Sequence, residues 1–185
     1  MKFHFLFRIF YYFFPLILLF ILGAIYPGSI AEGGSDLARK KLVTDFLYVF
    51  NINNTVLGLA PVPFSNNGPI AGGFTHIPGD TTIFVLNAGI YRINFSVSSN
   101  GQTLPNQFAI FVNGVLEPTT VYGSGGIIQQ TIGQTIEQTI GQAIVTLPDN
   151  AAITLRNIGF EAVILQNRAA RAININASLI IERLL

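Results

Sequence analysis

Few side chains in the body of this chain are of a type that could do chemistry. Between positions 45 and 137 the charged residues are Asp80, Arg92 and Glu117, which are far apart in the sequence, and His76 is the only histidine beyond position 8. A serine triad needs a base beside its nucleophile, and a metal site needs several ligands at short spacing. We therefore expect no catalytic, metal or cofactor site, and we do not expect an enzyme.

The isolated polar residues fit structural roles better. His76 lies in the segment Thr-His-Ile-Pro-Gly, which predicts a hydrogen-bonded histidine in a turn. Asp80 and Asp149 each follow a proline in a turn, and no series of Asp and Asn residues at calcium-ligand spacing accompanies them. Both aspartates are therefore predicted to stabilise their turns.

Two further sets of residues give only weak functional signals. Three arginines near the C-terminus are predicted to form a solvated face in preference to a basic binding patch: Arg156, Arg168 and Arg171. Three asparagines head Asn-x-Ser/Thr sequences: Asn53, Asn94 and Asn176. We expect none of these sequences to have a dedicated role, and Asn94 falls inside a predicted strand.

The composition limits the possible partners. Only 10% of the 185 residues are charged and 50% are hydrophobic, whereas roughly a quarter of the residues in an ordinary soluble domain are charged. Such a chain must bury surface in an oligomer, enter a membrane, or expose a surface of Thr, Asn, Gln and Ser. A net charge of +1 argues against nucleic acid as a partner. The absence of cysteine excludes disulfides but does not indicate a compartment.

The N-terminal segment, residues 1–31, is predicted to be a signal peptide or a membrane anchor. Two basic side chains lie in the first eight residues, and no charge follows from position 9 to position 26. These 18 residues would form a helix about 27 Å long, enough to cross a thin hydrocarbon core. Ser29 and Ala31 fit a signal-peptidase site. A third alternative is a buried helix of the globular domain. Both export interpretations place the body of the chain outside the cytoplasm.

Residues 32–43 have the composition of a linker, and from Thr44 the pattern becomes that of short strands. The segment Ser65–Gly73 is rich in turn formers. The predicted strands are Phe46–Ile52, Val56–Phe64 (at best an edge strand), Thr82–Leu86, Ile90–Ser98, two in the stretch Pro105–Gly126, Ala143–Leu147, Ala152–Asn157, Ala162–Gln166 and Ile173–Leu184. About ten short strands at a spacing of roughly 8–12 residues, with no strong helix, predict an all-β sandwich or barrel over residues 44–185.

Two features make particular strands clear. Asn113-Gly114 separates two extended runs and is the strongest short-range signal for a hairpin. Residues Ile90–Ser98 alternate, with Ile90, Arg92, Asn94 and Ser96 on one face and Tyr91, Ile93, Phe95 and Val97 on the other. The last predicted strand alternates similarly, with Ile173, Ile175, Ala177, Leu179 and Ile181 on one face.

A four-residue repeat, Gln-Thr-Ile-x, runs through residues 130–144. On a strand this period keeps Ile and Gln on one face and places Thr, Gly133, Glu137 and Gly141 on the other. Ile and Thr favour strand, and glycine disfavours helix. We interpret the repeat as an elongated hairpin or loop. The alternatives are a duplicated loop without a dedicated role and a ligand-binding or self-associating β-ladder.

Seven phrases occur in an order that resembles a known family. They are GFTHIPGD, AGIYRINFSVS, PNQFAIFVNG, TVYGSG, GQAIVTL, ITLRN and NASLIIERL. Together they resemble the C-terminal domain of the BclA-type collagen-like glycoproteins of the spore exosporium, over about Leu47 to Leu185. The resemblance implies a jelly-roll β-sandwich like tumour necrosis factor and the complement globular heads. It also implies a domain that forms homotrimers at the tip of surface filaments.

The chain departs from that family in two ways. It has no collagen-like Gly-x-y region, so there is no stalk for the domain to align. The segment Thr131–Ile140 lengthens the connection between Gln129-Gln130 and Gly141-Gln142 by about eight residues, and an even insertion keeps the strand faces in register. The fold is therefore expected to survive the insertion.

Two functions are consistent with these features. The first is an exported, self-trimerising structural protein of a spore or cell surface, with other spore-coat or exosporium proteins as further partners and with the membrane as a partner if residues 9–26 are retained. The second is a lectin-like or adhesin-like module that recognises carbohydrate or a host protein through loops such as Ser65–Gly73 and the repeat. The sequence does not identify ligand-binding residues for the second function.

Overall fold

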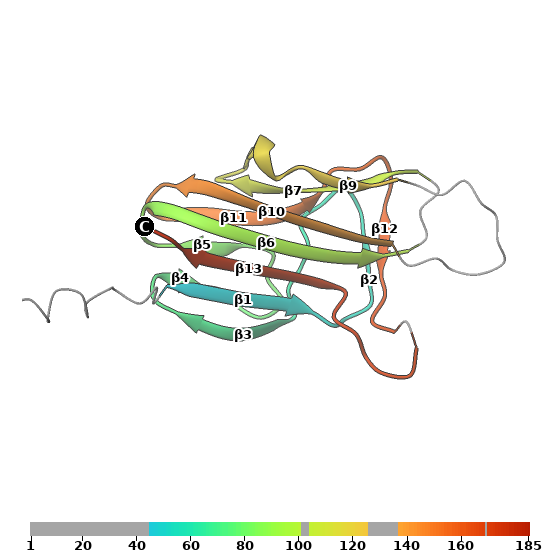
Figure 1. The fold of residues 1–185 in the computed structure, drawn as a ribbon. Coiled ribbons are helices and arrows are strands. Elements are labelled where there is room, and N and C mark those ends of the chain that lie inside the picture. Colours follow the sequence, from blue (N-terminus) through green and yellow to red (C-terminus); the bar gives the residue numbers. More distant parts are fainter. Residues whose placement is uncertain (1–44, 101–103, 126–136, 169) are drawn as a thin grey trace, which may run out of the picture. The chain divides into compact units, whose positions relative to one another are not determined.

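The computed structural model describes residues 45–100, 104–125, 137–168 and 170–185 (Figure 1). These residues belong to one compact unit, Val43–Leu185. The predicted N-terminal hydrophobic helix, as signal peptide or anchor, and the predicted linker lie outside the described residues. Within the described ranges, no helix has the length and hydrophobicity needed to cross a membrane.

The described residues form two packed antiparallel sheets and a short ribbon (Figure 1). The five-stranded sheet has the order β10 (Glu137–Leu147), β6 (Gly89–Ser99), β13 (Ala177–Arg183), β1 (Phe46–Asn51) and β3 (Asn66–Ala71). The six-stranded sheet has the order β4 (Phe74–Thr75), β5 (Ile83–Val85), β11 (Ala151–Asn157), β7 (Asn106–Val112) and β8 (Val115–Leu116), with β9 (Tyr122–Ser124) also paired to β7. The ribbon pairs β12 (Val163–Leu165) with β2 (Thr55–Leu57).

The path of the chain between the sheets makes this a jelly roll. The chain passes from β5 in one sheet to β6 in the other, then to β7, and later from β10 to β11 and on to β13. The chain therefore crosses repeatedly between the two layers, and the termini of the domain meet at one end of the sandwich (Figure 1). A sandwich of this kind buries the alternate residues of each strand between its two layers.

The core consists of the residues that point inward, which are every second residue along each strand. In β6 the residues Tyr91, Ile93, Phe95 and Val97 are buried, as the sequence pattern predicts. The six-stranded sheet contributes Ile83, Val85, Phe108, Ile110, Ile153 and Leu155, all fully buried. The prediction for β13 holds for Ala177, Leu179 and Ile181, which are buried, but it is wrong for Ile173 and Ile175, which are exposed and precede the strand.

The Asn-Gly hairpin is confirmed. Asn113 has φ = 51° and Gly114 has φ = 80°, so both central residues of the turn are left-handed, as a type I′ turn requires. The turn joins β7 to β8, with Val112 opposite Val115. The side-chain oxygen of Asn113 also accepts a hydrogen bond of 2.8 Å from the backbone N–H of Ala152, which holds the turn against β11.

The prediction that Ser65–Gly73 is a turn-rich loop is wrong. Residues Asn66–Ala71 form β3, an edge strand that pairs with β1, and the pairing shifts register between Leu47 and Val49. Pro69 is tolerated because an edge strand need not donate a hydrogen bond on its open side. The edge strand predicted over Val56–Phe64 is shorter than expected, because only Thr55–Leu57 forms a strand, β2.

The second half of the four-residue repeat, which we interpret from the sequence as an elongated hairpin or loop, forms a strand. Residues Glu137–Leu147 pair with β6 along all 11 residues of β10, so the strand begins six residues before the predicted start at Ala143. The expected faces are confirmed where they are described, because Ile140 and Ile144 point outward whereas Thr139 and Gly141 are buried. The first half of the repeat lies outside the described residues.

Candidate subunit interface

The outward face of the five-stranded sheet is the most distinctive surface of the described chain. Three rows of outward residues cross β1, β13, β6 and β10, with one residue from each strand in a row. The central rows are Tyr48–Ile180–Asn94–Gln142, Phe50–Ser178–Ser96–Ile140 and Phe46–Glu182–Arg92–Ile144. Each row places an aromatic ring at the β1 side, and two of the three place an isoleucine at the β10 side.

The β1 side of this face is an aromatic column of Phe46, Tyr48 and Phe50. The rings of Tyr48 and Phe50 stack, with centroids 5.3 Å apart and planes 26° from parallel. Gly68 on β3 makes room for this arrangement, because a Cβ atom there would lie 2.4 Å from Cδ1 of Tyr48. The column therefore presents ordered apolar surface beside the edge strand.

The β10 side is a column of alternating isoleucine and glutamine. Ile140 and Ile144 are each 63% exposed, which is high for β-branched apolar side chains on a paired strand. Gln138 and Gln142 lie on the same face and are also exposed. The side-chain amide of Gln138 donates a 2.9 Å hydrogen bond to the Ser96 hydroxyl, so the Gln138 amide has a hydrogen-bond partner within the sheet.

The centre of the face is small, polar and nearly free of charge. Ser96, Ser98 and Ser178 are half-buried between the two apolar columns. The ion pair of Arg92 and Glu182 is the only one described on this face, with 3.4 Å between Nη1 and Oε2. Both side chains are more than a third exposed, so the pair contributes little to folding stability. Small side chains between two apolar columns leave room for the side chains of another protein surface.

His76 has the structural role predicted for it, a hydrogen-bonded histidine in a turn. His76 is almost fully buried, its Nδ1 is hydrogen-bonded to Oδ1 of Asn67, and its Nε2 lies 3.1 Å from the carbonyl oxygen of Asp80. The turn that contains Asp80 is closed by its N–H, which donates to the carbonyl of Ile77. Within the described ranges no three potential metal-ligating side chains lie together. The structure thus brings His76 and Asp80 together as a turn.

The three arginines do not act as one patch. Arg156 lies on β11 in the six-stranded sheet, whereas Arg168 and Arg171 lie in the exposed loop after β12. Of the three Asn-x-Ser/Thr asparagines, Asn176 is buried and hydrogen-bonded to Asn51, and Asn94 lies inside β6. Asn53 is the exposed one of the three.

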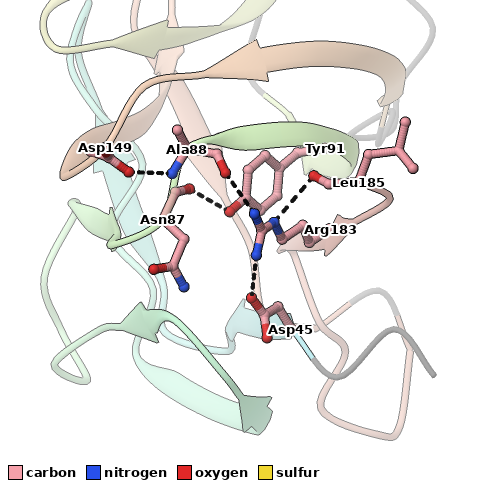
Figure 2. A network of polar contacts seen from close by, with 7 residues as sticks. All are labelled: Asp45, Asn87, Ala88, Tyr91, Asp149, Arg183 and Leu185. Atoms are coloured by element: carbon pink, nitrogen blue, oxygen red, sulfur yellow. Dashed lines mark hydrogen bonds and ion pairs between the residues drawn. The ribbon is translucent and has the colours of Figure 1, made fainter. Parts of the chain in front are cut away.

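A polar network that the sequence does not reveal joins the two ends of the domain (Figure 2). The Arg183 guanidinium donates 2.8 Å to the carbonyl of Ala88 and 3.1 Å to that of Leu185, and it lies 3.5 Å from the Asp45 carboxylate. Asp149 accepts a 2.6 Å hydrogen bond from the Ala88 N–H, so its side chain links its own turn to the turn before β6.

The network also surrounds the hydroxyl of Tyr91, which donates a 2.6 Å hydrogen bond to the carbonyl of Asn87 (Figure 2). Burial raises the pKa of Tyr91 above its ordinary value of 10.0, while the Arg183 charge lowers it and the carboxylates of Asp45 and Asp149 raise it. Nothing in this network resembles a nucleophile beside a base. It fixes the first and last strands of the domain to each other.

A second polar cluster lies between the sheets where β10 begins. The Ser124 hydroxyl is 2.8 Å from Glu137 Oε2, and the Thr139 hydroxyl donates 2.8 Å to Oδ1 of Asn106. The amide of Asn106 completes the cluster by donating to Ser99. One sequence signal points to this cluster, because Glu137 occupies the position in its repeat unit that glycine has in the units before and after it.

Comparison with solved structures identifies the architecture. The chain superposes on the tumour-necrosis-factor protein Eiger of S. frugiperda with a TM-score of 0.60 at 9% identity, covering 78% of this chain and 94% of that one. Murine APRIL gives 0.54 at 14% identity, with 75% and 98% covered. The globular domain of zebrafish complement 1qA gives 0.52 at 11% identity, with 76% and 98% covered.

The fold is a tumour-necrosis-factor-like jelly roll. The all-β jelly-roll sandwich expected from the sequence is thus confirmed for the described residues. No protein-family model matches the chain, and no curated protein matches it. At these identities the likeness concerns the fold, and function is argued below from the surfaces of the chain.

Proposed function

We propose that this protein is an exported structural protein whose jelly-roll domain, residues 44–185, associates with two further copies of itself. The observation that carries the proposal is the outward face of the five-stranded sheet, with its aromatic column, its Ile/Gln column and its single ion pair. Exposed apolar side chains on an ordered sheet are stabilised when a partner removes them from water. The number of copies rests on the resemblance to the trimeric exosporium domains and on the shared fold.

The low charge of the chain supports self-association. Only 10% of its residues are charged, and the described ones are mostly engaged in contacts within the domain, such as Asp149 with Ala88 and Glu117 with Thr119. A monomer would therefore meet water with the columns exposed. Interfaces depleted of charge and enriched in aromatic residues are typical of homo-oligomers.

Mass measurement tests this proposal directly. Light scattering on residues 42–185 is expected to give three times the chain mass at micromolar concentration, and Ile140→Lys should shift the protein to monomer. Ile173→Lys is the matched control, because Ile173 is similarly exposed, at 56%, but lies in the loop before β13 and off the face. A monomeric parent protein, or equal dissociation of both variants, would refute the assignment of this face.

The spore or cell-envelope location is also part of the proposal. It is supported by the seven phrases shared with exosporium glycoproteins and by the basic and then uncharged N-terminal segment. Other exosporium or spore-coat proteins would be neighbours there, and residues 9–26 would contact the membrane if they are not removed. The N-terminal mass of protein recovered from spores and from membranes tests this, and a chain that starts at Glu32 would refute the membrane anchor.

The alternative binding function loses part of its basis. One of the two loops expected to recognise a carbohydrate or a host protein, Ser65–Gly73, is largely the edge strand β3. The other, the repeat, is a paired strand from Glu137 onward. We therefore place self-association first.

A further inference from the structure

The outward face of the six-stranded sheet differs from the face proposed for self-association. Its described outward residues include one charged side chain, Arg156 on β11. The others are uncharged or apolar. Those at least partly exposed are Thr75, Phe84, Gln107, Phe111, Leu116 and Ala152, whereas Ala109 and Thr154 are buried. This face stays open if copies of the chain associate through the opposite sheet.

The Arg156 guanidinium is held in a fixed position on this face. Its Nε donates a 3.1 Å hydrogen bond to the hydroxyl of Thr154, and its Cζ lies 4.7 Å from the ring centroid of Phe111. The two ion pairs among the described residues are Arg92–Glu182 and Arg183–Asp45, and neither includes Arg156. The guanidinium is therefore oriented by neutral contacts, and its terminal nitrogens are not paired with a described carboxylate.

Apolar surface continues from this guanidinium in two directions. Leu116 lies opposite Phe111 on β8, and Phe84 lies opposite Ala152 on β5. Phe84 is 48% exposed, so one side of its ring is open to a ligand. Phe84 and Phe111 are two strands and two residues apart, which places their Cα atoms about 12 Å from each other.

We propose that this face binds an acidic oligosaccharide, with a sugar carboxylate on Arg156 and a sugar ring against Phe84. Charge complementarity carries the proposal, because the planar guanidinium is matched to a carboxylate and forms bidentate hydrogen bonds with it. An aromatic ring offers a flat apolar surface to the C–H groups of a sugar. The exposed side-chain amide of Gln107 supplies an uncharged polar group for a sugar hydroxyl, whereas the buried Thr154 hydroxyl orients Arg156.

The position of Arg156 favours a sugar over an acidic peptide. An extended peptide gains most of its affinity by adding to the open edge of a sheet. Arg156 lies inside the sheet, with Ala109 opposite it on one side and Pro61 on the other, so its backbone is already paired. Only side chains are available there, and a saccharide can bind side chains without adding a strand to the sheet.

Titration calorimetry on the full chain in neutral detergent tests the site, with oligogalacturonate as the acidic probe, a dextran oligosaccharide as the neutral probe and oligoglutamate as the acidic peptide probe. We expect oligogalacturonate to bind and the other two to bind at least about tenfold more weakly, the loss that removal of a charge-assisted bond typically causes. Arg156→Gln should reduce the binding of oligogalacturonate by a similar factor, and Phe84→Ala should reduce it without changing the charge.

Arg168→Gln is the matched control, because it removes the same charge from an exposed loop outside this face. Binding that falls equally in Arg156→Gln and Arg168→Gln would overturn the proposal, as would equal affinity for oligoglutamate or dextran, or no binding of oligogalacturonate. Thermal unfolding of each variant shows that the fold is kept, and a lysine at position 156 keeps the charge if the glutamine variant unfolds. Light scattering on the same samples reports self-association separately, so failure here leaves the proposed trimer unaffected.

Discussion

Replacing Gly141 by alanine is a sharp test of how the repeat strand fits the sandwich. Gly141 lies on the buried face of β10, opposite Phe95 on β6. A Cβ atom at this position would lie 2.2 Å from Cζ of Phe95 and 2.8 Å from Cδ2 of Tyr122. The two rings pack edge to face, with centroids 6.0 Å apart, and the Tyr122 hydroxyl is held by a 2.6 Å hydrogen bond to the carbonyl of Gln142.

The free energy of unfolding should fall by about 2 kcal/mol. Overpacking of a buried site costs about 1–3 kcal/mol, and the value here lies at the upper end because neither ring can move away without losing its own contacts. Against this, alanine restricts the unfolded chain and returns up to about 1 kcal/mol. For a domain of this size the net loss corresponds to a fall in melting temperature of about 4–8 °C.

Urea unfolding at one fixed protein concentration measures this loss, since self-association would couple stability to concentration. Gly58→Ala is the matched control, because a Cβ there meets no atom within 4 Å, and its stability should be unchanged or slightly higher. In a Phe95→Leu background, which lacks the Cε1 and Cζ atoms, the Gly141→Ala change should cost less. Equal stability of Gly141→Ala and Gly58→Ala would show that the close packing of Gly141 does not limit this strand.

Two further predictions concern the network at the ends of the domain. Because burial raises the pKa of Tyr91 in the folded state, Tyr91 contributes stability below pH 10 that is lost as the pH rises through the raised pKa. Urea midpoints measured at increasing alkaline pH should therefore fall less steeply in Tyr91→Phe than in the parent protein. At neutral pH, Tyr91→Phe should lower the free energy of unfolding by about 1 kcal/mol, because it loses the hydrogen bond to Asn87. Arg183→Gln should lower stability by about 1–2 kcal/mol in the same assay, whereas Arg92→Gln, whose ion pair is more exposed, should change it by less than about 0.5 kcal/mol. A flat alkaline profile in the parent protein, or equal losses for the two arginine variants, would contradict these expectations.

The parts of the fold that the sequence predicts are those set by local rules. The alternation of Ile90–Ser98 is enough to identify the buried face of β6, and Asn113-Gly114 is enough to identify the hairpin. Both signals depend on residues within a few positions of one another. The strand Asn66–Ala71 is missed because its residues favour turns, and it becomes a strand only through its pairing with β1, a contact with residues well before it in the chain.

The candidate surfaces are harder to predict than the core. Tyr48, Ile180, Asn94 and Gln142 come from four strands, and only the register of the sheet places them in one row. The same holds for Arg156, which looks like one of three C-terminal arginines in the sequence. The structure separates it from the others by its Phe111 and Thr154 neighbours.

The repeat raises the question of how β10 keeps a single register on β6. A shift by one unit of four residues would preserve the outward Ile/Gln column, and strand faces alone would not prevent it. It would, however, place Glu137 or Val145 opposite Phe95, where even a Cβ atom has no room. A shift by two units would bring Gly133 to that place but would carry Glu137 to the position of Val145, which is 5% exposed in the core, and burying a carboxylate there without partners is costly. The one glutamate among the glycines of the repeat therefore selects the register that presents Ile140 and Ile144 beside Ser96 and Arg92.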